Sequence, residues 1–210
     1  LVRAVRCILD AKSRGERVIR VFARTLSDLT EGEMLQLQKA ETCDTVEEDY
    51  LKVIYCKTAS LFEAASLSAA ISVNATEEMQ SSVRRFATDL GIAFQIRDDI
   101  FDYSLGMNVG KPVGADILER KITLPLLGAL AAVDSEKEAA NRTRPRSTEL
   151  DDPGREETCE FVRVNGGLEY AKKRMGDCRE SARRSLLELP CSPARDTLGE
   201  LLDFVGARTN

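Results

Sequence analysis

Apolar residues recur at helical spacing along almost the whole of this 210-residue chain, and alternating runs of the kind that form strands are few. The stretch 16–40 shows the pattern well, because its apolar residues fall on one face of a helix. They are Ile19, Phe22, Ala23, Leu26 and Leu29. We find no internal repeat and no alternation of strands with helices. The sequence therefore predicts an all-α fold.

The expected helices are separated by glycine, proline and polar residues, which begin or end helices. They cover 1–10, 16–40, 45–72 with Thr45 as a cap, 76–103, 168–187 and a last stretch that ends near 207. A loop at 106–114, rich in Gly and Pro, leads into 115–133, which contains Pro125. We interpret the charged stretch 135–157 as surface helix and loop. All of 1–210 is expected to form one helical domain.

The composition excludes several kinds of chemistry. The chain has no His, so Ser-His-Asp and Cys-His nucleophile systems cannot be built and zinc sites lose their usual ligand. Its 30 basic and 35 acidic residues give a net charge of −5, which favours neither nucleic acid nor an anionic membrane as a partner. The six cysteines form no CxxC pair, and no apolar run is long enough to span a bilayer. We expect a cytoplasmic protein with reduced thiols and no stable membrane insertion.

An acidic stripe carries the most specific chemical signal. Its residues Gln95, Asp98, Asp99 and Asp102 stand at i, i+3, i+4 and i+7, on a helix that is otherwise mostly apolar. Because such a helix belongs in a core, we expect the stripe to point into a cavity or at a partner. Three carboxylates on one buried face repel one another unless a cation lies between them, and oxygen ligands without His favour Mg²⁺. A solvated acidic face is the alternative, and the apolar surroundings count against it.

Lysines supply positive charge in two places. Lys57 and Thr58 lie in an apolar stretch rich in small residues, where an ammonium group is costly unless it meets an anion or extends to the surface. Lys111 and Lys121 follow the acidic stripe, and each by itself is consistent with an exposed loop charge. Taken together, a metal-binding stripe surrounded by lysines predicts a site for a diphosphate.

These segments resemble motifs of the trans-isoprenyl diphosphate synthases, or polyprenyl synthetases, in an order and spacing that match along nearly all of the chain. The similar segments are Gly32-Glu33-x-x-Gln36, Lys57-Thr58, Phe94-Gln95-x-x-Asp98-Asp99-x-x-Asp102, Gly110-Lys111-Pro112-x-Gly114-x-Asp116, Lys121-x-Thr123-Leu124-Pro125 and Gly166-Gly167-Leu168-Glu169-Tyr170-Ala171. Arg120 departs from the family pattern, which often has Gly at this position.

The resemblance implies an isoprenoid-synthase-type helical bundle around a central cavity. It implies a Mg²⁺-dependent prenyltransferase that condenses isopentenyl diphosphate with an allylic prenyl diphosphate, and the form of the motifs favours a medium- or long-chain product. It also assigns roles. Asp98 and Asp102 would bind the metal, with Asp99 in support. Lys57, Lys111 and Lys121 would contact the departing diphosphate. Thr58 and Gln95 would line the allylic carbocation.

The resemblance also leaves part of the family pattern without a counterpart. Family members are longer, and their N-terminal part carries a first aspartate-rich motif and basic residues for isopentenyl diphosphate, none of which occurs in 1–210. We therefore expect this chain to be the C-terminal portion of a homodimeric enzyme, lacking the N-terminal helices, and to be inactive in isolation. Two alternatives are a non-catalytic subunit of a heteromeric prenyl diphosphate synthase and a terpene cyclase. The intact acidic motif counts against the former, and the absence of an NSE-type metal motif counts against the latter.

Overall fold

A computed structural model describes residues 2–9, 14–103, 115–119, 121–133 and 152–207. Every regular element within these ranges is helical, which confirms the expected all-α class there. The elements are α1 (Val2–Leu9), α2 (Gly15–Thr42), α3 (Glu47–Ile54), the π-helical turn η2 (Tyr55–Ala59), α4 (Ser60–Ser72), α5 (Glu77–Asp102), α6 (Ala115–Leu118), α7 (Leu124–Ala131), α9 (Asp152–Val164), α10 (Gly167–Leu187) and α11 (Pro193–Ala207).

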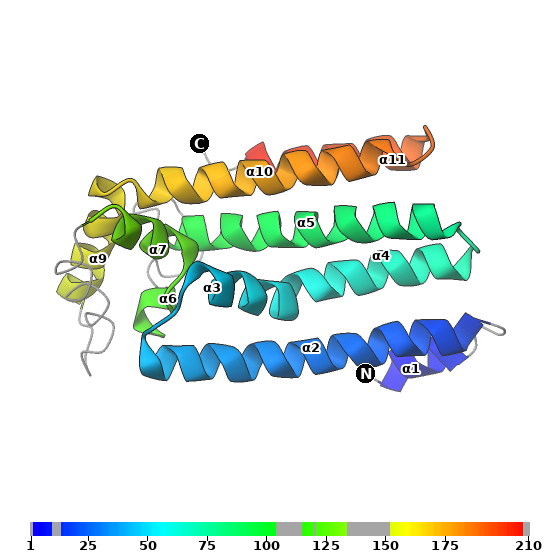
Figure 1. The fold of residues 1–210 in the computed structure, drawn as a ribbon, viewed down its shortest axis with the longest axis horizontal. Helices are drawn as coiled ribbons and strands as arrows, with labels where there is room; N and C mark the ends of the chain where they lie inside the picture. Colours follow the sequence, from blue (N-terminus) through cyan, green and yellow to red (C-terminus); the bar gives the residue numbers. More distant parts are fainter. Residues whose placement is uncertain (1, 10–13, 104–114, 120, 134–151, 208–210) are drawn as a thin grey trace.

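The long helices lie side by side along their lengths (Figure 1). In this row α5 has α4 and η2 on one side and α10 on the other, while α2 packs against the outer side of α4 and η2. The short helices α6, α7 and α9 gather at the end of the bundle where α5 finishes. This arrangement brings the C-terminal half of α5, the middle of the α3–η2–α4 run and the C-terminal half of α2 to neighbouring positions.

Helix α5 forms the centre of the core. The Thr76 hydroxyl caps its first turn by accepting a hydrogen bond from the Met79 N–H at 3.3 Å. Further along, apolar residues at three- and four-residue spacing are almost completely buried, and each contributes about 1.5–3 kcal/mol of transfer free energy if it is a large aliphatic side chain. They are Leu90, Ala93, Ile96 and Ile100. Their burial fixes which face of α5 is left for polar side chains.

The stretch 45–72, expected as one α-helix capped by Thr45, differs in two respects. Its N-cap is Val46, whose N–H donates to the Asp49 carboxylate at 3.2 Å, so that an acidic side chain of the first turn closes the helix start. The helix then widens into the π turn at Tyr55–Ala59 before α4 continues. A π turn contains one residue more than an α turn.

The burial pattern follows that extra residue. Tyr50, Ile54, Ala59 and Glu63 are all buried, at successive spacings of four, five and four residues. Leu61, which in an uninterrupted helix would lie two turns after Ile54 on the same face, is 48% exposed. The π turn therefore lets α3 and α4 both bury a face against the same neighbours.

The stretch 115–133 is two short helices and not one. Helix α6 ends at Leu118, and α7 begins at Leu124. Pro125 lies in the first turn of α7, where its missing N–H costs no helical hydrogen bond. Lys121 and Thr123 therefore lie in a non-helical segment between α6 and α7, and not on the face of a helix.

The structure describes only part of the stretch 135–157, which we interpret as surface helix and loop. Residues 134–151 lie outside the described residues, whereas 152–157 form the first turns of α9 and are not loop. All six cysteines carry free thiols. Within the described ranges, no helix combines the length and the apolar character needed to cross a membrane.

Candidate functional site

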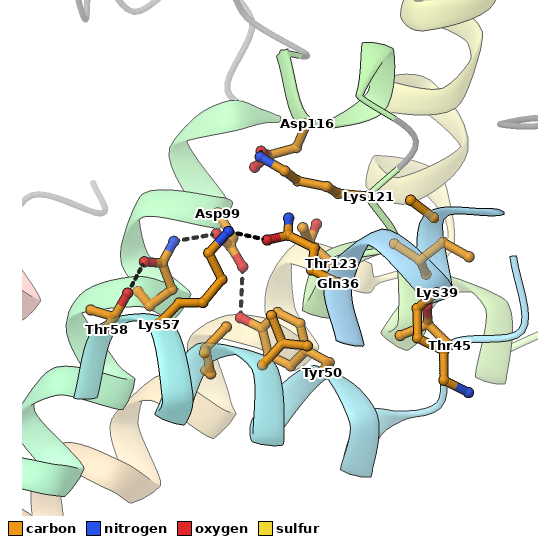
Figure 2. A pocket seen from close by; sticks show the side chains of 15 residues that line it. Gln36, Lys39, Thr45, Tyr50, Lys57, Thr58, Asp99, Asp116, Lys121 and Thr123 are labelled. Atoms are coloured by element: carbon orange, nitrogen blue, oxygen red, sulfur yellow. Dashed lines mark hydrogen bonds and ion pairs between the residues drawn. The ribbon is translucent and has the colours of Figure 1, made fainter. Parts of the chain in front are cut away.

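A cavity of about 260 Å³ lies where α2, α3, η2 and α5 meet the segment between α6 and α7 (Figure 2). Five residues expected at a functional site line it, namely Lys57, Thr58, Gln95, Asp99 and Lys121. The other polar side chains on its wall are Gln36, Lys39, Thr45, Tyr50, Asp116 and Thr123. Residues far apart in the sequence thus meet around one space.

A chain of hydrogen bonds crosses the cavity wall from η2 through α5 to α3 (Figure 2). The Thr58 hydroxyl donates to Gln95 Oε1 at 2.8 Å, and Gln95 Nε2 donates to Asp99 Oδ1 at 2.9 Å. The Tyr50 hydroxyl donates to Asp99 Oδ2 at 2.7 Å. Because Gln95 accepts from Thr58 and donates to Asp99, the orientation of its amide is fixed, with the oxygen toward η2.

Burial is the main cause of the shifted pKa values in this chain of hydrogen bonds. It raises the pKa of Asp99 to about 7, although the hydrogen bonds from Tyr50 and Gln95 act in the opposite direction. Burial, with the nearby Asp99 charge, also raises the pKa of Tyr50 well above its ordinary value. The Tyr50 hydroxyl therefore keeps its proton and remains a donor to the carboxylate.

Lys57 reaches the cavity from the π turn and is held there by α2. Its ammonium group lies 2.6 Å from Glu33 Oε2 and donates a hydrogen bond to Gln36 Oε1. Gly32 allows this approach, since a Cβ at that position would lie 2.7 Å from the Cβ of Cys56 and 2.9 Å from Cγ of Lys57. The segment Gly32-Glu33-x-x-Gln36 thus serves to bring α2 against Lys57.

Lys121 enters the cavity from the break between α6 and α7. Its ammonium group lies 2.5 Å from Glu119 Oε2 and 3.1 Å from Asp116 Oδ1, and these carboxylates raise the pKa of Lys121 despite its partial burial. Lys121 lowers the pKa of Glu119, and Lys57 contributes to that shift from across the cavity. The two ammonium groups therefore face a common space from different elements.

The acidic stripe does not enter the cavity as a unit. Asp99 is buried in the wall, whereas Asp98 is exposed and neither it nor Asp102 is among the lining residues. Asp102 is half-buried and accepts a hydrogen bond from the Asp116 N–H at 3.0 Å. The expectation of three carboxylates on one buried face is wrong for Asp98, because Asp98 lies on an uncovered side of α5 although its neighbours Arg97 and Asp99 are buried. Lys111 lies outside the described residues.

No arrangement of three His, Cys, Asp or Glu side chains fit to hold a metal ion occurs among the described residues. Some residues of the wall were not singled out from the sequence as site residues. Tyr50 lies two helical turns before Lys57, a spacing that could have drawn attention to it. Lys39 lies one turn after Gln36 on α2 and is paired with Asp49 at 2.8 Å and Asp44 at 3.2 Å.

The described residues thus form an all-α bundle with a cavity lined by Lys39, Lys57 and Lys121. The chain belongs to the polyprenyl synthetase family, whose sequence model matches residues 1–153. It is 36% identical to the octaprenyl diphosphate synthase of Escherichia coli over 186 residues, which are 87% of this chain and 56% of that enzyme.

Solved structures agree with this assignment. A decaprenyl diphosphate synthase from Rhodobacter capsulatus superposes with a TM-score of 0.87 and 34% identity, covering 96% of this chain and 62% of that one. A polyprenyl synthase from Caulobacter crescentus, complexed with calcium and isoprenyl diphosphate, superposes with a TM-score of 0.89 and 31% identity. The match covers 100% of this chain and 63% of that one. This chain spans between half and two thirds of the length of these relatives.

Proposed function

We propose that the protein is a Mg²⁺-dependent prenyltransferase that extends an allylic prenyl diphosphate with isopentenyl diphosphate. The observation that carries the proposal is the convergence of Lys57 and Lys121 on one cavity whose wall contains the Thr58–Gln95–Asp99–Tyr50 hydrogen-bond chain. Family membership supports it, as does the isoprenyl diphosphate bound to a relative that matches the whole of this chain.

Each group in the cavity suits one part of such a reaction. The Lys57 and Lys121 ammonium groups would bind the diphosphate and stabilise its negative charge as it departs. The Thr58 hydroxyl and the Gln95 amide offer oxygen dipoles to the positive charge that forms on the allylic fragment. Asp99, with both carboxylate oxygens already engaged, would orient Gln95 and not contact the substrate.

The donor chemistry of the acidic stripe fits Mg²⁺ in part. Asp98 and Asp102 lie one turn apart on α5 and carry the hard oxygen donors that Mg²⁺ prefers. We assign the ion to these two residues, with Asp99 in support. When bound, Mg²⁺ would supply positive charge that neutralises the diphosphate oxygens. Water and the diphosphate would supply the remaining oxygen ligands.

We also propose a product length, a cellular location and an oligomeric state. A medium- or long-chain product is supported by relatives that are named octaprenyl and decaprenyl diphosphate synthases. We further propose a cytoplasmic homodimer in which 1–210 belong to one helical domain. Gel filtration with light scattering tests the oligomeric state, and the lengths of the products test the first proposal.

Binding of inorganic pyrophosphate tests the site directly. We expect Lys57→Ala and Lys121→Ala each to weaken its binding by roughly 10- to 100-fold in Mg²⁺, because each removes a charge-assisted hydrogen bond of about 1.5–3 kcal/mol. Isothermal titration calorimetry of this chain gives the dissociation constants. Lys52→Ala is the control, since Lys52 is an exposed lysine paired with Glu31 outside the cavity.

Catalysis is tested with the native gene product. Incubation with farnesyl diphosphate, isopentenyl diphosphate and Mg²⁺ should give longer prenyl diphosphates, and Asp98→Ala should abolish them. The absence of elongated product, or full activity in Asp98→Ala, contradicts the proposal. So does pyrophosphate binding that both lysine substitutions leave unchanged.

A further inference from the structure

Glu33 neutralises the lysine that the proposed reaction needs. The Glu33 carboxylate lies 2.6 Å from the Lys57 ammonium group, at the rim of the cavity and outside its lining. Its side chain is 56% exposed, whereas that of Lys57 is 30% exposed. The second partner of Lys57, Gln36, is a neutral amide in the cavity wall. In the ligand-free state the positive charge of Lys57 is therefore largely compensated by one half-exposed carboxylate.

The two partners of Lys57 differ in what an incoming anion would do to them. Gln36 and an anionic oxygen can both accept from the same ammonium group, because that group has three N–H donors. Glu33 and the anion carry like charges, and the two would repel each other across Lys57. An ion pair as exposed as Lys57–Glu33 is worth only about 0–1 kcal/mol, so a diphosphate with several charges can displace it.

Lys121 has a similar pair of partners. Asp116 lines the cavity and is largely buried, whereas Glu119 has a side chain that is 62% exposed. Lys57 and Lys121 thus each have one partner in the cavity wall and one more exposed carboxylate outside the lining. Because the Glu33 contact depends on Gly32 letting α2 come close, it is built into the packing of α2 against η2.

We propose that Glu33 is an exchangeable counter-ion, which holds Lys57 extended toward the cavity and is displaced from it when a diphosphate binds. Glu33 is thus a positioning residue that the ligand must outcompete, and it lowers the affinity of the site for anions. This inference rests on the proposed function, since it takes Lys57 as a diphosphate ligand.

The test is pyrophosphate binding to this chain in Mg²⁺, measured by calorimetry on Glu33→Gln and on a matched control. We expect Glu33→Gln to tighten binding about two- to fivefold, the loss of a competing pair worth up to about 1 kcal/mol. Glu31→Gln removes the same charge two residues earlier, from a carboxylate of similar exposure that lies 2.5 Å from Lys52. It should leave the affinity unchanged, and circular dichroism verifies that both variants fold.

Three other results would each overturn the counter-ion role of Glu33. If Glu33→Gln leaves the affinity unchanged or weakens it while Lys57→Ala weakens binding as expected, the counter-ion role is wrong and the proposed function stands. If Glu31→Gln tightens binding as much as Glu33→Gln, the effect is one of net charge and the inference is overturned. If Lys57→Ala leaves binding unchanged, the assignment of Lys57 fails, and the role of Glu33 fails with it.

Discussion

Tyr50 shows how a single hydroxyl can fix the polar wall of the cavity. It is fully enclosed and donates to Asp99, whose other oxygen accepts from Gln95. A carboxylate buried without that donor would bear an unpaid desolvation cost. The orientation of Gln95, and through it of Thr58, therefore depends on a residue that lies on a different helix.

We expect Tyr50→Phe to lower the free energy of unfolding by about 1–3 kcal/mol, because it leaves one Asp99 oxygen buried without its donor. Urea denaturation measures the change. In an Asp99→Ala background the same substitution should cost much less, which isolates the pair in a double-mutant cycle. Tyr170→Phe is the control, since Tyr170 donates to Glu47, a carboxylate with 30% of its side chain exposed. Equal losses in the two single variants would contradict the account.

Residue-scale prediction from sequence succeeded where a helix face alone decides the outcome. The spacing of Gln95 and Asp99 predicts that both lie in one wall, and both line the cavity. The apolar setting of Lys57 leaves open whether its ammonium group meets an anion or extends to the surface. It failed for Asp98, because helical spacing shows which residues share a face but not where the neighbouring helices stop covering it. The roles of Tyr50 and Glu33 need tertiary contacts that no local pattern contains.

At the scale of elements, the approach of α2 to the π turn decides whether the cavity has its lysine. Gly32 and Lys57 come from segments that are adjacent only in space, and nothing larger than a hydrogen fits between them without displacement. The helix boundaries could largely be predicted, since caps and glycines mark them. The π turn could not, because no local pattern marks the extra residue. The break between α6 and α7 was missed, although Pro125 in the first turn of α7 is a local signal for a helix start.

Gly32→Ala should separate α2 from η2. Its Cβ would lie 2.7 Å from the Cβ of Cys56, so we expect a loss of stability of about 1–3 kcal/mol from overpacking and weaker pyrophosphate binding. Gly176→Ala provides the control, since nothing lies within 4 Å of a Cβ there. That variant should gain about 0.5–1 kcal/mol from helix propensity alone. Chemical denaturation and calorimetry measure both quantities, and a Gly32→Ala variant that gains stability would refute the close-packing argument.

At the scale of the whole molecule, the cavity joins segments that span residues 36 to 123. The unfolded chain cannot present these residues together, so a ligand of the cavity binds the folded state alone. Folding and ligand binding are therefore linked through the entire bundle. Helical periodicity is enough to predict the all-α class. It does not predict which segments line the cavity together, because that depends on how the helices are arranged against one another.

Pyrophosphate with Mg²⁺ should raise the thermal unfolding midpoint. At 100 times the dissociation constant the linkage adds about 2.7 kcal/mol, which corresponds to a shift of roughly 5–10 °C for a chain of this size. Differential scanning fluorimetry measures it, and Mg²⁺ alone provides the baseline. The shift should shrink in Lys57→Ala at the same ligand concentration. An equal shift in that variant would mean that the anion stabilises the protein from somewhere else.

The π turn at Tyr55–Ala59 has a consequence for how this region tolerates insertions and deletions. One residue corresponds to about 100° of rotation in an α-helix, so the extra residue sets the phase between the faces of α3 and α4. Deleting one residue from the turn would restore ordinary α geometry and change the spacings of the buried residues from four, five and four to four, four and four, so that Ala59 and Glu63 would keep their face. Converting the turn to α geometry at full length would instead rotate α4 against α5 and turn Leu61 inward. We therefore expect a one-residue deletion within the turn to be tolerated, whereas the same deletion elsewhere in α3 or α4 changes the phase of the helix beyond it.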